Sequence, residues 1–246
     1  MSFLFVLTVG LVAGTISGIV GTGSSIMLMP VLVYQYGPKE AVPIMAVAAV
    51  MANLSRILAW WREVDWRACA AYSITGIPAA ALGARTLLAL PSQSVDIAIG
   101  LFLIAMVPVR HWLARHHLKF SLWHLAIGGA GIGYLTGIVV STGPLSVPLF
   151  LFYGLARGAF LATEAASSLG LYLSKSVTFQ RFGALTQDVA LKGLLAGSSL
   201  MFGAFIAKRF VLRLDADVFR LVMDAIMLAA GLSMLFDALW SAPVVS

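Results

Sequence analysis

A succession of long apolar stretches, separated by short charged loops, constrains this chain more than any other feature. Most of the stretches approach the roughly 20 residues that an α-helix needs to cross a bilayer. Hydrophobic residues make up 61% of the chain and charged residues 11%, whereas a soluble domain carries roughly 25% charged residues. Because hydrocarbon offers the backbone no hydrogen-bond partner, such stretches must be helical. The sequence therefore predicts an all-α, polytopic bundle of transmembrane helices.

Two of the apolar segments are too short to cross a bilayer alone. The predicted segments are Phe3–Val20, Ile26–Tyr36, Ala41–Trp61, Ala68–Leu88, Val95–Val109, Leu122–Val140, Leu145–Leu155, Ala159–Phe179, Val189–Ala207 and Val218–Leu239. The short segments, Ile26–Tyr36 and Leu145–Leu155, each follow a longer one across a glycine-containing break, GIVGTGSS at Gly18–Ser25 and GIVVSTGP at Gly137–Pro144. Each broken segment is either a single crossing or a hairpin that returns to its own side of the membrane.

The two breaks belong to a pattern that suggests an internal duplication. Shifting the chain on itself by about 119 residues aligns ISGIVGTG at Ile16–Gly23 with LTGIVVST at Leu135–Thr142. Further short matches keep their order along the whole half. The sequence therefore predicts an N-terminal transmembrane repeat over residues 1–117 and a C-terminal one over residues 118–246, with the seam in the basic loop around Arg110–Lys119.

The distribution of basic residues bears on the orientation of the two halves. If the broken segments are single crossings, the Lys and Arg residues outside the spans divide evenly between the two sides. If they are hairpins, Lys39, Arg85, Arg181 and Lys192 face one side and the remaining basic residues face the other. The positive-inside rule favours the second arrangement. Each half then has a hairpin and three spans, an odd number of crossings, so the repeats are inverted, which is a common plan of transporters.

Both breaks are predicted to contribute to a binding site. A gap in a transmembrane helix frees backbone N–H groups, so the gap must face protein, water or a ligand. The helix that begins after a gap presents a positive dipole end, which suits an anion. The predicted substrate ligands at the breaks are Gly21, Thr22, Gly23, Ser24, Ser25, Ser141, Thr142 and Gly143. The alternative is that these small residues only allow helices to pack closely.

Arg56 and Lys175 lie inside apolar spans, and the repeat alignment superposes them. A cation at the centre of a bilayer costs at least about 2.5 kcal/mol, so it usually faces the interior of the bundle. We expect the two cations to flank a central anion site, with Asn53 among the polar groups around them. The alternative is that both long side chains snorkel to the headgroups.

Asp224 and Glu164 are acidic residues within predicted spans. Either could carry a coupling proton, or could form an ion pair with Arg56 or Lys175 that stabilises the fold. The sequence does not choose between these roles, and coupling to a proton or to sodium remains open.

Several classes of protein are disfavoured. The net charge of +6 resides in short loops at the ends of helices, where membrane orientation explains it better than nucleic acid does. Phosphate-binding loops, HExxH and Cys/His zinc spacings are absent from the sequence, so we expect no cofactor, no metal and no enzymatic activity. The histidines near the seam, His111, His116, His117 and His124, are too loosely spaced to indicate a metal site.

The stretch GTISGIVGTGSSIMLMPVL at Gly14–Leu32 resembles the glycine-rich opening of the sulfite exporter TauE/SafE family, also called the toluene sulfonate uptake permease family. The second break at Thr136–Pro148 and the two-repeat layout extend the resemblance over essentially the full chain. The family often has a run of glycines where this chain has Gly23-Ser24-Ser25, and Gly143-Pro144 stands where a glycine pair is expected.

The resemblance implies a secondary carrier in a bacterial plasma membrane. Its substrate would be a small anion, a sulfur oxyanion or an organosulfonate such as sulfite or sulfoacetate, carried by alternating access. Two alternatives remain open, a channel-like anion pore and a membrane subunit that only serves another protein. The partners expected are the substrate anion, the lipid bilayer and, as an open question, a second copy of the chain in a homodimer.

Overall fold

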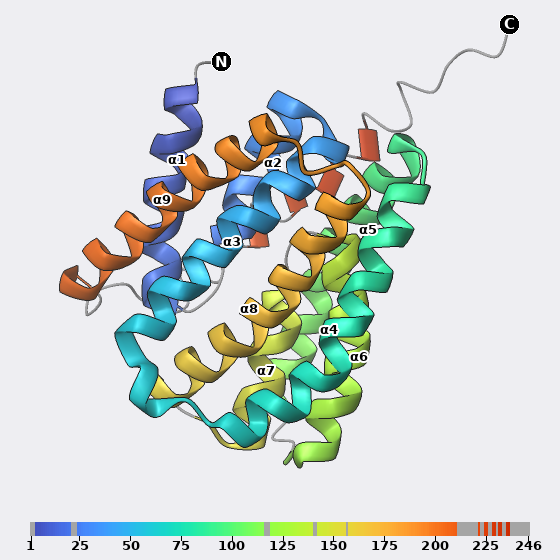
Figure 1. Ribbon diagram of the computed structural model, residues 1–246. Coiled ribbons are helices and arrows are strands. Elements are labelled where there is room, and N and C mark those ends of the chain that lie inside the picture. Colours follow the sequence, from blue (N-terminus) through green and yellow to red (C-terminus); the bar gives the residue numbers. More distant parts are fainter. Residues whose placement is uncertain are drawn as a thin grey trace, which may run out of the picture.

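The computed structural model describes residues 3–20, 24–115, 119–139, 142–155 and 157–210, together with 221, 224–225, 228–229, 231–232 and 235–236. Within these residues the chain forms helices and no strands (Figure 1). The helices are α1 (Phe3–Val20), α2 (Ser24–Tyr36), α3 (Pro38–Trp60), the short 3₁₀ helix η1 (Trp61–Glu63), α4 (Trp66–Ala89), α5 (Ser92–Arg115), α6 (Leu122–Ile138), α7 (Gly143–Tyr153), α8 (Arg157–Arg181) and α9 (Gln187–Phe210). The all-α prediction is confirmed.

The predicted apolar segments coincide with these helices except at the seam between the two halves. The loop predicted around Arg110–Lys119 is wrong in its first part, because α5 continues to Arg115. Hydropathy falls after Val109, but the polar residues that follow do not interrupt helical hydrogen bonding, so the helix outlasts its apolar stretch. The predicted segment Val218–Leu239 lies largely outside the described residues.

The long helices pack on one another in a fixed order. α6 packs on α4, α4 on α8, α8 on α3, α3 on α9, and α9 on α1. The central pair, α3 and α8, runs side by side through the middle of the molecule (Figure 1). The short helices α2 and α7 lie against this pair, since α2 packs on α3 and α7 on α8.

Glycines allow the outer helices to approach closely. On α6, a Cβ at Gly129 would overlap the backbone oxygen of Tyr72 on α4, and a Cβ at Gly133 would overlap that of Gly76. The same device joins α1 to α9, because a Cβ at Gly14 would overlap the backbone of Leu200. Such contacts of small residues are typical of helices that associate in membranes.

The second broken segment folds back on itself. The backbone N–H of Phe120, just before α6, donates to the backbone oxygen of Phe152 near the end of α7, at 2.9 Å. The two rings also meet edge to face, with centroids 5.3 Å apart. Gly154 then ends α7 in the left-handed conformation, with φ of 106°, which glycine adopts without strain. α6 and α7 therefore form a helical hairpin, and this hydrogen bond joins the start of α6 to the end of α7.

The first broken segment also returns to the end from which it starts. α1 runs parallel to α9, since Gly10 lies against Ser199 and Gly14 against Leu200. The start of α9 meets the end of α2 and the start of α3, because Lys192 Nζ lies 4.5 Å from the Tyr36 ring and 2.6 Å from Glu40 Oε1. α1 and α2 therefore form a second hairpin (Figure 1).

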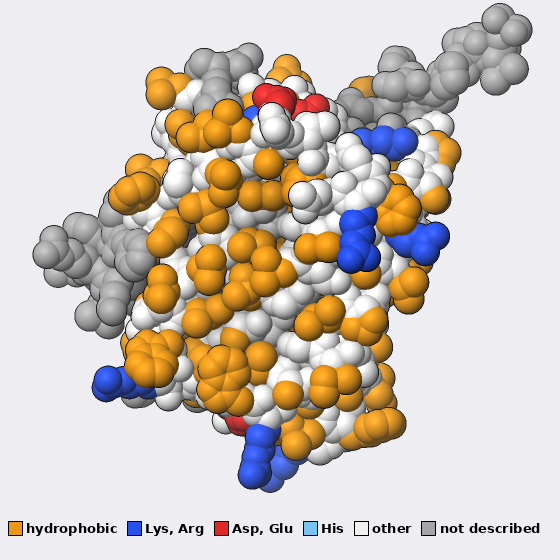
Figure 2. All heavy atoms as spheres, in the orientation of Figure 1, with side chains coloured by type: hydrophobic (Ala, Val, Ile, Leu, Met, Phe, Trp, Pro, Cys, Tyr) orange, Lys and Arg blue, Asp and Glu red, His pale blue; other side chains and the backbone are white. Residues whose placement is uncertain are grey.

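Polar groups are gathered inside the bundle and hydrophobic ones outside. Buried polar residues include Asn53, Glu164 and Lys175, each at most 3% exposed. Large hydrophobic side chains such as Ile74 and Phe202 are exposed, and hydrophobic side chains are spread over the whole face in Figure 2. A soluble protein rarely exposes so much contiguous apolar surface, whereas lipid covers it without cost.

Among the described residues one helix, Lys39–Glu63, has by itself the length and apolar composition to cross a membrane. The shorter apolar helices are Leu4–Thr15, Met27–Tyr36, Gln93–Val109 and Leu122–Ile138. α8 is long enough, but it contains the buried charges of Glu164 and Lys175 as well as terminal arginines. Glu164 and Lys175 face the bundle interior, which is the usual place for charged groups in a membrane helix.

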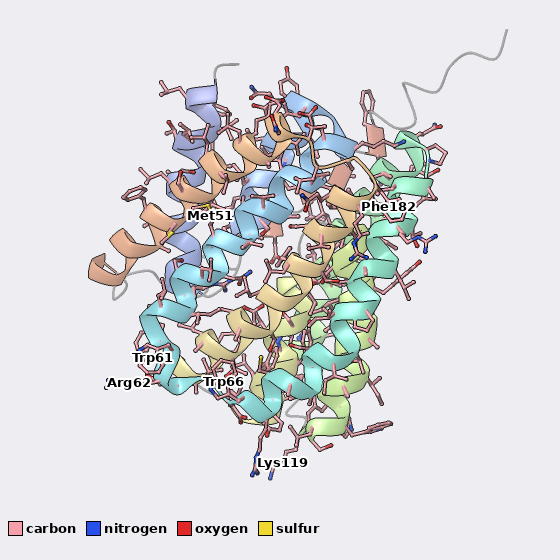
Figure 3. The ribbon with its side chains drawn as sticks, in the orientation of Figure 1. Met51, Trp61, Arg62, Trp66, Lys119 and Phe182 are labelled. Carbon is pink, nitrogen blue, oxygen red and sulfur yellow. The ribbon has the colours of Figure 1, made fainter. Side chains whose placement is uncertain are left out.

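The two ends of the bundle differ in character. Trp61, Arg62, Trp66 and Lys119 lie at one end, and Phe182 lies toward the other (Figure 3). Exposed tryptophans beside basic residues are typical of a membrane–water interface.

Candidate functional site

Part of the predicted site lies outside the described residues, namely Gly21, Thr22, Gly23 and Ser141. The residues that begin the helices after the breaks are described. Ser24 and Ser25 start α2 and are 5% and 8% exposed. Thr142, 5% exposed, precedes α7, which begins at Gly143. The predicted hydroxyl groups at both breaks are therefore inside the bundle.

Thr142 links the two arms of the α6–α7 hairpin. Its hydroxyl forms a short hydrogen bond with the hydroxyl of Thr136 on α6. Thr136 donates its hydroxyl proton to the backbone oxygen of Ile132, so it accepts from Thr142 in the bond between the two hydroxyls. The backbone oxygen of Thr142 accepts from the N–H groups of Leu145 and Ser146 and so opens α7.

Lys175 is bound to the end of α6. Its Nζ donates to the backbone oxygens of Thr136 at 2.6 Å and Val139 at 2.9 Å. The last carbonyls of a helix lack partners within the helix and carry its negative dipole end, so an ammonium group is well placed there. With 1% exposure, Lys175 does not snorkel toward headgroups.

Arg56 forms an ion pair with Glu164. Arg56 Nη1 on α3 lies 3.2 Å from Glu164 Oε2 on α8, with side-chain exposures of 13% and 4%. Arg56 Nη2 donates to Asn53 Oδ1, one turn earlier on α3. The predicted pairing of Glu164 with one of the two buried cations is therefore present, and the partner is Arg56.

Glu164 has its second oxygen fully engaged as well. Oε1 accepts hydrogen bonds from Ser146 on α7 at 3.0 Å and from Ser168 on α8 at 2.8 Å. The carboxylate therefore connects the central helix pair to the α6–α7 hairpin. Ser146 also lies 3.3 Å from the backbone oxygen of Gly143, a second acceptor for its hydroxyl proton.

Further polar groups surround this ion pair. Asn53 donates through Nδ2 to the backbone oxygen of Ala49, which fixes its amide and thereby directs Oδ1 at Arg56. Ser25 of α2 is hydrogen-bonded to the hydroxyl of Tyr172 on α8. We call the set Ser25, Asn53, Arg56, Ser146, Glu164, Ser168 and Tyr172 the Arg56 cluster. It draws on α2, α3, α7 and α8, and so on both hairpins and the central pair.

The structure places Asp224 with a different partner. Its Oδ2 lies 3.4 Å from His111 Nε2 on α5. This contact differs from the predicted pairing of Asp224 with Arg56 or Lys175. In the part of the chain that the structure describes, no group of three His, Cys, Asp or Glu side chains is arranged to hold a metal.

Sequence reasoning missed Ser146 and Ser168. Ser168 lies one helical turn after Glu164, on the same face of α8, and this spacing alone could have identified it. Ser146 carries no comparable signal, because its contact with Glu164 depends on how the hairpin packs against α8.

The sequence of the chain is similar to those of proteins named as membrane transporters. The chain is 28% identical, over an alignment 191 positions long that covers 71% of the chain, to "Probable membrane transporter protein y4hK" of Sinorhizobium fredii (strain NBRC 101917 / NGR234), of which the match covers 73%. It is 23% identical, over an alignment 256 positions long that covers 94% of the chain, to "Probable membrane transporter protein YjnA" of Bacillus subtilis (strain 168), of which the match covers 98%. No solved structure matches the chain.

The family model described as "Sulfite exporter TauE/SafE" matches residues 6–234, which include both hairpins and the whole Arg56 cluster. A buried polar interior, an apolar exterior and two relatives named as membrane transporters all agree with this match. The chain therefore belongs to the sulfite exporter TauE/SafE family of membrane transporters.

Proposed function

We propose that this membrane transporter is a secondary carrier of a small anion, a sulfur oxyanion or an organosulfonate, and that the anion binds to Arg56. The observation that carries the proposal is a guanidinium group, 13% exposed, held inside the bundle between Glu164 on α8 and Asn53 on α3. A cation in such surroundings is costly and usually has a role in transport. Ser146, Ser168 and Tyr172 add hydroxyl donors nearby.

The hairpin tips would complete the binding site. The residues that we assign there are Gly21, Thr22, Gly23, Ser24, Ser25, Ser141, Thr142 and Gly143, with Asn53 and Lys175 as supporting polar groups. Backbone N–H groups at the start of α2 and α7 would add partial positive charge. Lys175 would act chiefly by holding the end of α6, since its ammonium group is bound to Thr136 and Val139.

Transport would proceed by alternating access between two inverted repeats, residues 1–117 and 118–246. The packing order supports this, because it reads the same from either end once α1, α3 and α4 are matched with α6, α8 and α9. A duplicated pair of hairpins around α3 and α8 is the kind of arrangement in which one repeat rocks against the other.

The location that we propose is the inner membrane of a bacterium, crossed several times. The end with Trp61, Arg62, Trp66 and Lys119 would face the cytoplasm, in agreement with the positive-inside rule (Figure 3). At the opposite end the charge of Lys192 is offset by Glu40 and Asp188, each 2.6 Å away.

The test is transport by the purified chain in liposomes loaded with radiolabelled sulfite or methanesulfonate. We expect saturable flux with counterflow, reduced at least about tenfold by Arg56→Ala, since a charge contact of about 1.4 kcal/mol or more is lost. The matched control is Arg62→Ala, an exposed arginine that lies against the Trp61 ring and should transport normally.

Three outcomes would overturn parts of the proposal. Equal flux in the Arg56→Ala and Arg62→Ala variants would remove Arg56 from the site. Current without saturation or counterflow would indicate an anion pore. No flux of any anion by a well-folded chain would favour a subunit that needs a partner protein.

A further inference from the structure

We propose that the Glu164 carboxylate occupies the anion position on Arg56, and that a singly charged anion replaces it there while Glu164 takes up a proton. The inference rests on the proposed function, and it adds the coupling ion and the charge of the substrate. In the structure, Glu164 Oε2 already sits 3.2 Å from Arg56 Nη1, as an oxyanion substrate would. The Glu164 carboxylate and a substrate anion would therefore compete for the same guanidinium group.

The charge balance of the exchange favours this coupling. The Arg56–Glu164 pair has no net charge and is almost fully buried. Adding an anion alone would leave one uncompensated negative charge in a medium of low polarity, which is strongly unfavourable. If the incoming anion binds Arg56 and one proton binds Glu164, the site again has no net charge. No bond other than the new O–H bond is formed.

The groups around Glu164 can accommodate the protonated form. Ser168 now donates to Oε1, but a hydroxyl group also accepts, so it can turn to receive the proton of a carboxylic acid. Ser146 has the backbone oxygen of Gly143 as an alternative acceptor at 3.3 Å. Neither serine is left without a partner when Glu164 changes state.

Other titratable groups near Glu164 do not replace it in this role. Tyr72 on α4 and Tyr172 on α8 interact electrostatically with Glu164, and both are neutral donors in the ordinary pH range. From η1, Glu63 faces the start of α8 near Gly158, two turns before Glu164. Lys175, further along α8, is bound to the α6 carbonyls. Arg56 is the cation that Glu164 contacts.

The contact with Ser146 extends the exchange to the hairpin. Ser146 lies in the first turn of α7, so Glu164 holds the start of α7 only while it accepts from that hydroxyl. Release of Glu164 from Arg56 would change this contact as well. Substrate binding and the packing of the hairpin tip against α8 are therefore linked through one carboxylate.

The same balance determines the class of substrate. One positive charge and one proton compensate a single negative charge, so a monoanion such as a sulfonate or bisulfite fits the site. A dianion would need a second proton or a second cation, and Lys175 is already committed to Thr136 and Val139.

The experiment measures binding of methanesulfonate to the purified chain by calorimetry. Methanesulfonate keeps one negative charge across the range, so any pH dependence belongs to the protein. Between about pH 6 and pH 8 we expect the dissociation constant to rise about tenfold per pH unit, as linkage to one proton requires. In weak buffer, binding should take up about one proton per anion, a measurement that needs no variant.

Two variants sharpen the test. Glu164→Gln should bind methanesulfonate tightly with no pH dependence and without proton uptake, because its side chain mimics the protonated acid. Glu40→Gln is the matched control, since Glu40 also pairs with a cation, Lys192, but far from the Arg56 cluster along α3. It should behave as the parent chain does.

The outcomes separate the two proposals. Tight binding by the parent chain with no pH dependence and no proton uptake would overturn the role of Glu164 and leave the anion site intact. A dissociation constant that still depends on pH in Glu164→Gln would also overturn the role of Glu164 and leave the anion site intact. Failure of both the parent chain and Glu164→Gln to bind methanesulfonate at any pH would overturn the proposed sulfonate site itself.

Discussion

In the proposed duplication Arg56 and Lys175 occupy corresponding positions, yet their surroundings in the structure differ. Arg56 contacts side chains, the carboxylate of Glu164 and the amide of Asn53. Lys175 contacts backbone, the carbonyl oxygens of Thr136 and Val139 at the end of α6. One cation therefore has partners that can rotate away or change protonation, and the other has partners that belong to a helix.

This difference separates a site that can exchange ligands from one that holds the fold. A carboxylate gives up its cation when it is protonated, whereas a backbone carbonyl has no such alternative. In the proposed duplication, the Arg56 side has become the exchangeable site, and the Lys175 side fixes the α6–α7 hairpin against α8. The following predictions test that assignment.

The largest effect is expected from Arg56→Met. It leaves the buried Glu164 carboxylate without its ion-pair partner, which should lower the free energy of unfolding by about 3–5 kcal/mol. Adding Glu164→Gln should recover most of the loss, because the uncompensated charge is then gone. Unfolding by denaturant in detergent measures both variants. If the double variant is as unstable as Arg56→Met, the ion pair with Glu164 is not the source of the stability that Arg56 contributes.

Lys175→Met should cost about 2 kcal/mol of unfolding free energy. Two carbonyls lose a charged donor, and the removal of a buried charge offsets part of the cost. Here the addition of Glu164→Gln should recover nothing, since Glu164 is bound to Arg56. The same denaturant titration decides the matter. Recovery in this double variant would mean that Lys175 and Glu164 act together, and the contrast between the two cations would be lost.

Two glycines of α6 test whether this helix is held in place. Gly133→Ala would push a methyl group into the backbone of Gly76 on α4 and should destabilise the chain by about 1–3 kcal/mol. Gly131→Ala meets nothing within 4 Å and should be neutral or slightly stabilising, through its higher helix propensity. Melting temperatures in detergent compare the pair. Equal melting temperatures would contradict the close packing of α6 on α4.

The smallest effect is expected from Ser168→Ala. It removes one of the two hydroxyl donors to Glu164 Oε1 and should cost about 1 kcal/mol of stability. The lost hydrogen bond is charge-assisted in the free site and neutral in the occupied one, so the free site is weakened more and methanesulfonate should bind a few-fold more tightly at neutral pH. Ser174→Ala is the control on the same helix, because Ser174 donates to the backbone oxygen of Ile77 instead. A tighter-binding Ser174→Ala would argue against a local cause.

The sequence predicted the helices well because hydropathy reports directly on burial in lipid. It also located both breaks, since glycine, serine and threonine in the middle of an apolar stretch are unusual. It failed at Arg110–Arg115, where a helix extends beyond its apolar part. Hydropathy marks where a helix leaves the membrane, and helical hydrogen bonding can continue past that point.

The site could be predicted only in part, for a related reason. The cost of burying charge identified Arg56, Glu164 and Lys175, and an ion pair was one of the arrangements expected. Which acid meets which cation depends on how helices cross, and the sequence carries no direct record of it. Ser146 illustrates the limit, because an ordinary serine became a ligand of Glu164 only through the folding back of α7.

The hydrogen bond between Phe120 and Phe152 bears on how the chain enters a bilayer. α7 has 11 residues, about half of what a span needs to be inserted as an independent segment. Because this bond joins the end of α7 to the start of α6, the two helices can be inserted as one unit. The polar residue Thr142 at the start of α7 is then buried within protein as the unit enters the bilayer. We therefore regard the hairpin, and not the single helix, as the element that membrane insertion handles in each half of this chain.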